Sequence, residues 1–366
     1  MGLKQRAFDW LDLRLGVRDI LQQNLTHYLL PRNINVWYTL GATLLVLFSL
    51  QFITGIFLLV YYIPNTEQAF ASVQRIMNDI PYGWLVRFLH ATGSNVVILV
   101  LFLHMLSTLY MAAYKRPREI TWIFGFLIFL VSLAMSLTGY LLPWSQLSYW
   151  ATTVATESAG ATPVIGEAMI HFLRGGPAVG EFTLGRFFAL HVMGLPLIFA
   201  LLAGGHLFCV RRIGVSRPPF GPDYLPEAPG TSFHHTDHSG GIPFFPNYVV
   251  KDLMVIAFFL TLLAAGAFFA PQLSLPPEAF EPADPFRTPP GIKPEWYFLA
   301  AYQLLRILPN EFLGLVVQGG AVAFLLFLPF IDRGPERRPG RRPLFLGLFI
   351  VGLAGFLILT VWGYLS

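Results

Sequence analysis

The stretch FLHATGSNVVILVLFLHMLSTLY, residues 88–110, is apolar over a length that crosses a membrane, and it contains two histidines, His90 and His104. A helix needs about 20 apolar residues to span the roughly 30 Å of hydrocarbon in a bilayer. Ionisable residues inside such a span are rare, and by default they mark a functional site. The stretch therefore predicts a transmembrane helix that carries a pair of functional histidines.

Six further stretches share this length and this lack of charge. With the first, the predicted spans run near 36–63, 88–114, 120–144, 187–210, 253–272, 312–331 and 343–366. The composition agrees, because 55% of the 366 residues are hydrophobic and only 12% are charged, which is too apolar for a soluble domain of this size. The sequence predicts an all-α integral membrane protein with seven transmembrane helices.

The distribution of basic residues predicts the orientation. Seventeen of the 24 Lys and Arg residues lie before the first span or in the loops that share its side, and cytoplasmic loops hold such an excess. The N-terminus is therefore expected on the cytoplasmic, negative (n) side, and the odd number of spans puts the C-terminus on the positive (p) side. The net charge of +4 reflects this topology, so we expect membrane lipids and no nucleic acid as partners.

The spans fall into a group of four and a group of three, separated by the polar, proline-rich stretch SRPPFGPDYLPEAPG. Apolar residues alternate with Arg and Asp near the N-terminus, which predicts an amphipathic helix on the membrane surface. The expected units are a surface segment at 1–32, a four-helix domain at 33–212, a cytoplasmic linker at 213–246 and a three-helix domain at 247–366.

Two minor features of the sequence carry little weight. His234, His235 and His238 lie in the linker, where we favour a solvated segment over a metal site because no fixed scaffold or fourth ligand is apparent. Cys209 is the single cysteine of the chain. It excludes an internal disulfide and leaves too little sulfur for a thiolate cluster.

The spacing of four histidines is the strongest functional signal. His90 and His104 are 14 residues apart, about 21 Å along a helix and within about 40° of the same face. His191 and His206 in the span near 187–210 are 15 residues apart, about 22 Å, with an overshoot of about 60°. The two helices run parallel because two crossings separate them, so His90 is expected to meet His191 near the p side and His104 to meet His206 near the n side.

Each of these pairs can supply both axial ligands of a heme iron. A bis-histidine heme has no open coordination position, so such hemes transfer electrons and do not activate substrates. A buried histidine can also simply hydrogen-bond across helices, or belong to a proton relay. Neither alternative requires two pairs at matching depths, and we therefore favour two hemes.

Glycines on two other spans repeat the histidine period. Gly41 and Gly55 are 14 residues apart, as are Gly125 and Gly139. A flat macrocycle that lies against a helix needs a residue without a side chain at the contact, although glycine also serves close helix packing in membranes. Arg87 lies one turn before His90 and either pairs with a heme propionate or extends to the interface as a snorkelling arginine.

Three motifs carry a resemblance to a known family: TGYLLPWSQLSYW at 138–150, TLGRFFALH at 183–191 and KPEWYFLAAYQLLR at 293–306. With the histidines and glycines, they resemble the cytochrome b subunit of quinol:cytochrome c oxidoreductases, the cytochrome bc complexes. The first four helices resemble the photosynthetic branch and the last three its subunit IV, whereas IPFFPNYVVKD at 242–252 is similar to the respiratory branch. The resemblance implies a fusion of the two parts in one chain.

The resemblance also implies a mechanism. A quinol is oxidised near the p side, with one electron leaving to a Rieske iron–sulfur protein and the other crossing two non-covalent b hemes to a quinone near the n side, which contributes to the proton motive force of a respiratory chain. The photosynthetic branch has a third, covalent heme, which is not expected here because Thr39 occupies the position of its cysteine. A c-type cytochrome subunit, a homodimeric complex and a bacterial cytoplasmic membrane are the further expectations.

Residue roles follow from the same resemblance. Glu295 is expected to accept a quinol proton, since a carboxylate at the membrane interface with a raised pKa shuttles protons near neutral pH. Tyr149 and Tyr297 are expected to assist, and Lys251 and Asp252 to contact the quinone near the n side. An acid at a helix start, interfacial tyrosines and a basic residue at an n-side helix end are also ordinary features of membrane proteins.

Two other classes of protein remain open at this point. A proton-coupled transporter would use intramembrane His and Glu as a proton path, but it predicts interrupted spans in two corresponding halves. A di-heme membrane anchor of a dehydrogenase would bind hemes in the same way and pass electrons to a soluble subunit. The Pro-Glu-Trp-Tyr motif at 294–297, after an additional group of helices, speaks against the anchor.

Overall fold

Seven helices of the structure are long and apolar enough to cross a membrane, which confirms the predicted all-α fold. The structure is a computed structural model that describes residues 2–31, 33–220 and 241–366. The spanning helices are α3 (Leu40–Leu59), α5 (Gly83–Tyr110), α6 (Glu119–Leu141), α10 (Leu195–Ile213), α11 (Val249–Phe269), α13 (Glu311–Ile331) and α14 (Pro343–Leu365). The α10 span begins earlier, because α9 (Glu181–Ala189) and a π-helical segment (Leu190–Gly194) lead into it without a break.

The ends of the spans differ from the expected ends by up to about ten residues. The fifth span shows the largest difference, because it covers Phe244–Phe269 where 253–272 was expected. Lys251 and Asp252 lie inside its first turns. Charged side chains are tolerated there because the end of a span lies at the level of the polar headgroups.

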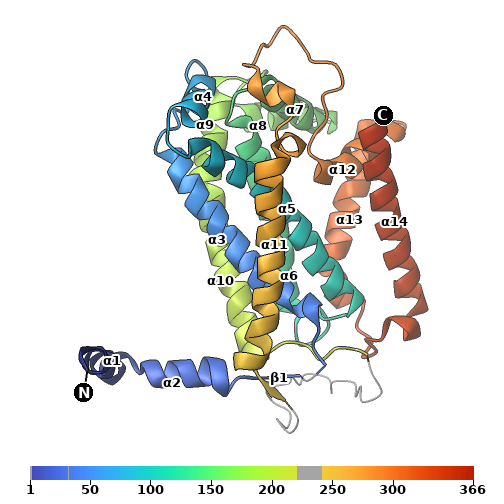
Figure 1. Ribbon diagram of the computed structural model, residues 1–366. Helices are drawn as coiled ribbons and strands as arrows, with labels where there is room; N and C mark the ends of the chain where they lie inside the picture. The colour runs from blue at the N-terminus through green and yellow to red at the C-terminus, as the bar shows by residue number, and fades with distance from the viewer. Residues whose placement is uncertain (1, 32, 221–240) are drawn as a thin grey trace.

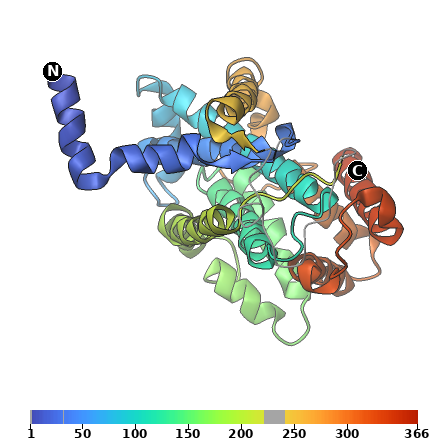
Figure 2. The same ribbon diagram turned by 90° about the horizontal axis from the view of Figure 1, so that it is seen from below.

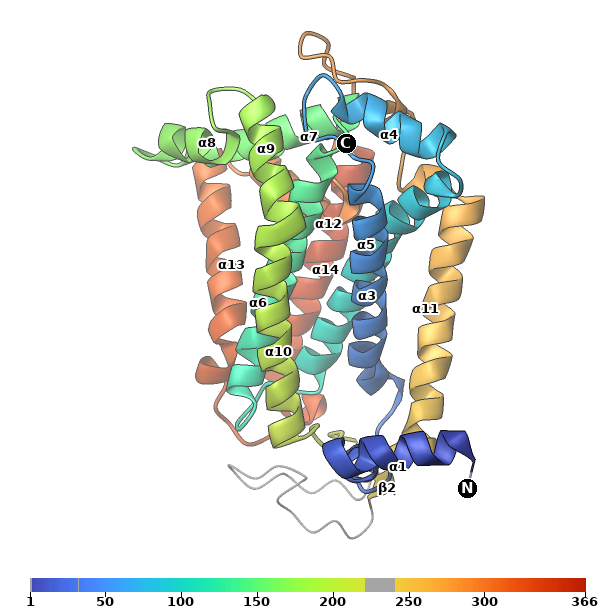
Figure 3. The same ribbon diagram turned by 90° about the vertical axis from the view of Figure 1, so that its left-hand side faces the viewer.

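The first four spanning helices form a bundle of two tight pairs. α3 packs along α5, and α6 packs along α10 (Figures 1 and 3). Between the pairs, the rings of Phe48 of α3 and Phe199 of α10 are tilted against each other with centroids 4.3 Å apart. Phe102 of α5 and Phe129 of α6 meet edge to face at 5.1 Å. Such aromatic contacts fill the middle of the bundle with apolar rings.

A layer of short helices covers the end of the bundle that is predicted to face the p side, called the p-side end below (Figure 1). These are α4 (Ala69–Asn78), α7 (Gln146–Glu157), α8 (Gly166–Arg174) and α12 (Trp296–Ile307). Short 3₁₀ turns precede α3 (Val36–Thr39) and α14 (Pro339–Arg341) at the opposite end of the bundle. In the layer itself, such turns follow α7 (Ser158–Ala161) and lie between α11 and α12 (Pro271–Leu273 and Pro277–Phe280). The C-terminus lies in the same layer, as the odd number of spans requires.

The opposite, n-side end holds the N-terminal arm. Helices α1 (Leu3–Leu15) and α2 (Val17–Leu21) lie roughly at right angles to the bundle and project away from it (Figures 1 and 2). None of the described residues in these two helices is buried, as expected for a surface segment. After a π turn at Gln22–Thr26, β1 (Leu29–Leu30) pairs antiparallel with β2 (Ile242–Pro243), which precedes the π segment Phe244–Tyr248 and α11.

The last three spanning helices do not pack together as one unit. α11 lies against α3 and α5, whereas α13 packs on α6 and, with α14, surrounds α12. The view from the n side shows α11 and the α13–α14 pair on different flanks of the four-helix bundle (Figure 2). The predicted division at 213–246 is therefore a division of the sequence, while in space the C-terminal part holds the bundle from two sides.

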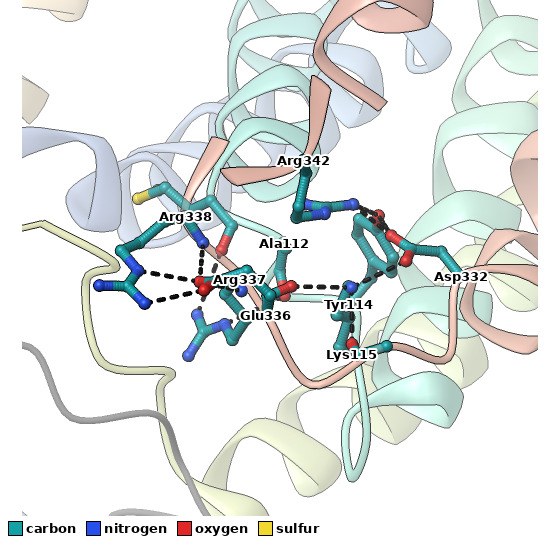
Figure 4. A network of polar contacts seen from close by, with 10 residues as sticks. Ala112, Tyr114, Lys115, Asp332, Glu336, Arg337, Arg338 and Arg342 are labelled. Atoms are coloured by element: carbon teal, nitrogen blue, oxygen red, sulfur yellow. Dashed lines mark hydrogen bonds and ion pairs between the residues drawn. The ribbon is translucent and has the colours of Figure 1, made fainter. Parts of the chain in front are cut away.

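A buried polar network joins the two parts at the n side (Figure 4). Lys115, after α5, donates to Asp332 Oδ1 at 2.8 Å and to the Gly334 carbonyl at 2.7 Å. Tyr114 donates to the other oxygen of Asp332 at 2.5 Å, and Arg342 forms an ion pair with the same carboxylate. Lys115 and Arg342 are almost fully buried, so the anion of Asp332 is what makes their burial tolerable.

Candidate functional site

The four histidines lie where the sequence analysis expected them, two on each of two parallel helices. The rings of His90 and His191 lie next to each other, with centroids 6.3 Å apart and their planes nearly perpendicular at 84°. Two metal–nitrogen bonds of about 2 Å each take up about 4 Å of such a gap, and the two ring radii account for the rest. A metal ion therefore fits between the two imidazoles.

The π-helical segment Leu190–Gly194 resolves the unequal spacing of the two helices. It contains His191, so one extra residue is accommodated between His191 and His206. A π turn holds one more residue than an α turn, and such turns occur frequently at functional sites. The 15-residue interval on α10 thus matches the 14-residue interval on α5, and the overshoot expected for a regular helix is removed.

Each histidine is backed by one of the four glycines. A Cβ atom at Gly41 would lie 3.8 Å from His104 Cε1, and one at Gly55 would lie 3.3 Å from His90 Cε1. At Gly125 it would lie 3.1 Å from His206 Cε1.

At Gly139 the added atom would overlap the imidazole of His191. The glycines predicted for their period therefore lie beside the imidazoles at all four positions, and at Gly55, Gly125 and Gly139 a side chain would crowd the ring.

Hydrogen bonds orient three of the rings. His191 Nδ1 lies 2.9 Å from the Met135 carbonyl, and His206 Nδ1 lies 3.0 Å from the Thr121 carbonyl. His90 Nδ1 lies 2.9 Å from Thr54 Oγ1. A histidine that donates its Nδ1 proton presents an unprotonated Nε2, which is the form that binds a metal.

Arg87 provides a further test of whether a heme fits. Its guanidinium is buried, and both terminal nitrogens have no hydrogen-bond partner among the residues that the structure describes. It lies 5.2 Å from the ring of Phe280 and lines the same cavity as His90. A buried cation without an anion is costly, and a propionate would supply that anion. The histidine pairs, the glycines and Arg87 together fit two b hemes.

Glu295 lines the cavity that contains His90 and His191. The cavity measures about 310 Å³ and also contains Tyr140 and Tyr297. Glu295 directly precedes α12. Burial raises the pKa of its carboxyl to about 7, although a hydrogen bond from Tyr140 acts in the opposite direction. A carboxyl with this pKa can accept and release a proton at neutral pH.

Tyr140 is a site residue that sequence reasoning missed. It adjoins Gly139 in the motif TGYLLPW, and that adjacency is the signal that pointed to it. Tyr149, expected to assist Glu295, is not among the residues that line this cavity. Its ring packs edge to face on Trp144 and Trp150, with centroids 5.6 Å and 5.4 Å away. Tyr140 thus lies in the position beside Glu295 that was predicted for Tyr149.

Gln146 was also missed, although it lies within the motif TGYLLPWSQLSYW at 138–150. It is 2% exposed and holds the loop that precedes Glu295 on the p side. Its Nε2 donates to the Arg287 carbonyl at 3.1 Å, and its Oε1 accepts from the Asp284 amide at 3.0 Å. The loop is thereby fixed beside the first residue of α7.

The residues predicted to contact a quinone near the n side are separated by their environments. Lys251 lines a second cavity of about 540 Å³ and donates to the Ile34 carbonyl at 3.3 Å. Asp252 is buried, and its Oδ1 accepts no hydrogen bond from the described residues. The histidines at 234, 235 and 238 lie outside the residues that the structure describes.

Two family models match the chain, one over its N-terminal part and one over its C-terminal part. Residues 25–214 match the family model of Cytochrome b/b6/petB, and residues 282–366 match that of Cytochrome b(C-terminal)/b6/petD. The chain is 38% identical to the cytochrome b of Rhodospirillum rubrum over 99% of this chain and 85% of that protein. It is 36% identical to the cytochrome b/c1 of Bradyrhizobium diazoefficiens and spans 50% of that protein's length.

A solved structure has the same fold. A chain of a hyperthermophilic respiratory complex III superimposes with a TM-score of 0.90 at 39% identity, over 97% of this chain and 91% of that one. The whole chain, including the helices on both flanks of the bundle, therefore has the architecture of this relative.

Proposed function

Because the chain belongs to the cytochrome b family, we propose that it is the di-heme subunit that oxidises quinol in a cytochrome bc complex. The chain is a subunit of a quinol:cytochrome c oxidoreductase, the class of enzyme to which respiratory complex III belongs. The observation that carries the proposal is the facing pair His90 and His191, which share one cavity with Glu295. Oxidation of a quinol removes electrons and protons, so it requires an electron acceptor such as a heme and a proton acceptor in the same cavity.

His90 with His191 would hold the heme nearer the p side, and His104 with His206 the one nearer the n side. When bound, the two hemes supply a pair of one-electron carriers across the membrane. Gly139 and its counterparts leave room beside the ligating rings, and Arg87 would neutralise a propionate.

Glu295 would accept a proton from the quinol hydroxyl in its unprotonated form. Tyr140 hydrogen-bonds to Glu295, and Tyr297 lies beside both in the cavity. Burial of Glu295 keeps the carboxyl desolvated and its pKa near neutral. Tyr149 supports this layer from the adjoining aromatic cluster.

The complex would contain a Rieske iron–sulfur protein and a c-type cytochrome subunit, and it would be a homodimer in a bacterial cytoplasmic membrane. The Rieske protein would take one electron on the p side, and the other would return to a quinone near the n side. Lys251 and Asp252 are our candidates for contacts to that quinone, since Asp252 offers a buried oxygen without a donor.

A redox titration of the purified protein, followed in the optical spectrum, tests the proposal. Extraction with pyridine counts the non-covalent hemes per chain. We expect two b hemes with separate midpoints and reduction of both by quinol in a preparation that contains the Rieske protein. One heme, or none, would refute the histidine pairing, and two hemes that quinol does not reduce would favour the membrane anchor of a dehydrogenase.

A further inference from the structure

A single hydrogen bond joins the Glu295 segment to the helix that carries His90. The indole nitrogen of Trp296 donates to Asn95 Oδ1 at 2.8 Å. Asn95 belongs to α5, and Trp296 is the first residue of α12, 201 positions further along the chain. The bond therefore connects the four-helix bundle with the C-terminal part next to the cavity.

Asn95 lies within the apolar part of α5, five residues after His90. An amide at this depth is unfavourable unless its polar atoms have partners. Its Nδ2 donates to the Ala91 carbonyl at 3.4 Å, which turns Oδ1 toward Trp296. The side chain therefore has a fixed orientation on the same helix as a predicted heme ligand.

Trp296 is held on its other sides by rings. Its centroid lies 6.0 Å from that of Phe102 on α5 and 5.4 Å from that of Tyr297, with the second pair edge to face. Glu295 and Trp296 share a peptide bond, so a shift of the Trp296 backbone at the start of α12 also moves Glu295. Residues 292–295 before α12 form no regular secondary structure, so Glu295 is held mainly from the side of α12.

We propose that Asn95 is a positioning residue that, through its hydrogen bond with Trp296, fixes Glu295 relative to the His90 helix. The inference rests on the proposed role of Glu295 as proton acceptor. Loss of the bond leaves a half-buried indole N–H without its partner, and α12 then gains freedom at its first turn. A displacement of about 1 Å at a reacting group costs up to about 100-fold in rate.

The effect is expected in turnover and its pH dependence. Asn95→Ala and Trp296→Phe each remove the bond, and Trp296→Phe retains a ring of similar shape. We expect about a 10-fold lower kcat for quinol oxidation in each, with little change in KM. The acid limb of the pH profile moves to lower pH, because a loosened Glu295 is better hydrated and its pKa falls toward the ordinary value.

A double-mutant cycle in the purified complex isolates the bond. If the bond is the cause, the double variant has the kcat of either single variant, because the same interaction is lost only once. Trp122→Phe is the matched control. It removes an indole hydrogen bond of 2.8 Å to the Leu325 carbonyl, which also joins the two parts of the chain but lies outside the cavity, and we expect an unchanged kcat and pH profile.

Several outcomes would overturn the inference while leaving the proposed function intact. These are an unchanged kcat in both single variants, losses that add in the double variant, or an equal loss in Trp122→Phe. If Asn95→Ala loses a heme, Trp296→Phe decides, and a normal turnover there refutes the inference. Failure of the wild-type complex to oxidise quinol would instead refute the proposed function.

Discussion

Gly139 is the glycine with the least free space among the four that back the histidines. A methyl group there would overlap the imidazole of His191, whereas at Gly41 it would lie 3.8 Å from His104 Cε1, an ordinary contact. Forcing a methylene into a packed site costs about 1–3 kcal/mol, which weakens binding roughly 5- to 150-fold. We expect Gly139→Ala to lose the p-side heme selectively.

Pyridine extraction and a redox titration measure this effect. Gly41→Ala, the same substitution beside the n-side histidine His104, is the control, and it should retain both hemes. Equal heme contents in the two variants would show that the overlap at Gly139 is relieved by movement of α6.

Glu295 makes the reaction sensitive to pH. Burial raises the pKa of its carboxyl to about 7, and only the unprotonated form accepts a proton. Quinol oxidation should therefore slow as the pH falls through about 7, and Glu295→Gln should remove this limb and lower kcat by at least about 100-fold. The pH–rate profile of the complex measures both, with Glu281→Gln, an exposed acid, as the control. An unchanged acid limb in Glu295→Gln would assign it to another group.

At the scale of residues, spacing predicted more than local motif reading did. The histidine and glycine periods are properties of a helix, and the structure brings these residues together as expected. The π turn around His191 could not be predicted, because one extra residue in a helix leaves no mark on composition. Tyr149 was preferred to Tyr140 because the sequence does not say which of two nearby tyrosines faces a cavity.

Among the elements, the p-side loop at 281–287 is held by backbone hydrogen bonds and by the side chains of Trp150 and Gln146. Gln146→Ala removes its two hydrogen bonds to the loop backbone, worth about 1–3 kcal/mol together. We expect a several-fold lower kcat for quinol oxidation, an unchanged heme content and faster cleavage by trypsin after the exposed Arg287. Kinetics and limited proteolysis measure these effects.

Gln272→Ala is the control for this prediction, since Gln272 is exposed in a neighbouring p-side segment. If the two variants are cleaved at the same rate, the loop does not depend on Gln146.

Spanning helices were predictable as elements, and the layer above them was not. Apolar length alone predicts a span, and the seven spans were found. α4, α7, α8 and α12 are short and partly polar, and their positions depend on tertiary contacts such as the one between Gln146 and Asp284. The apolar length of a segment therefore does not predict these helices.

For the whole molecule, Asp332 is the anion that holds the two parts together at the n side. Asp332→Asn retains the shape but leaves Lys115 and Arg342 buried without a counter-charge, at a cost of about 3 kcal/mol. We expect a thermal unfolding temperature lower by several degrees. Arg333→Gln, at an exposed neighbour, should have no effect.

The same network predicts a dependence of stability on pH. Burial acts to raise the pKa of Asp332, but the hydrogen bonds from Lys115 and Tyr114 and the charge of Arg342 outweigh it, so its pKa lies below the ordinary value. A lowered carboxyl pKa contributes stability that is present above the ordinary value and is lost as the pH falls through the lowered one. Thermal unfolding below about pH 4 should show this loss in the wild type and not in Asp332→Asn.

The family and the seven-helix fold were predicted from the sequence and are confirmed, whereas the arrangement of the C-terminal helices was not predicted. A break in composition at 216–230 suggests two consecutive units. Sequence order does not say that α11 and the α13–α14 pair lie on different flanks, because both positions bury a helix equally well.

The pairing of α3 with α5 and of α6 with α10 has a consequence for biogenesis. Each pair contributes one histidine and its opposite glycine to both cofactor sites, so neither pair contains a complete site. Helices pack more closely within each pair than between the pairs, where rings such as Phe48 and Phe199 meet. We expect the two helical hairpins to insert separately and the uptake of prosthetic groups to be the step that joins them, since a ligand that binds only the joined form stabilises it by mass action. A cell short of iron would accumulate the chain as two unjoined hairpins, open to proteases along the seam.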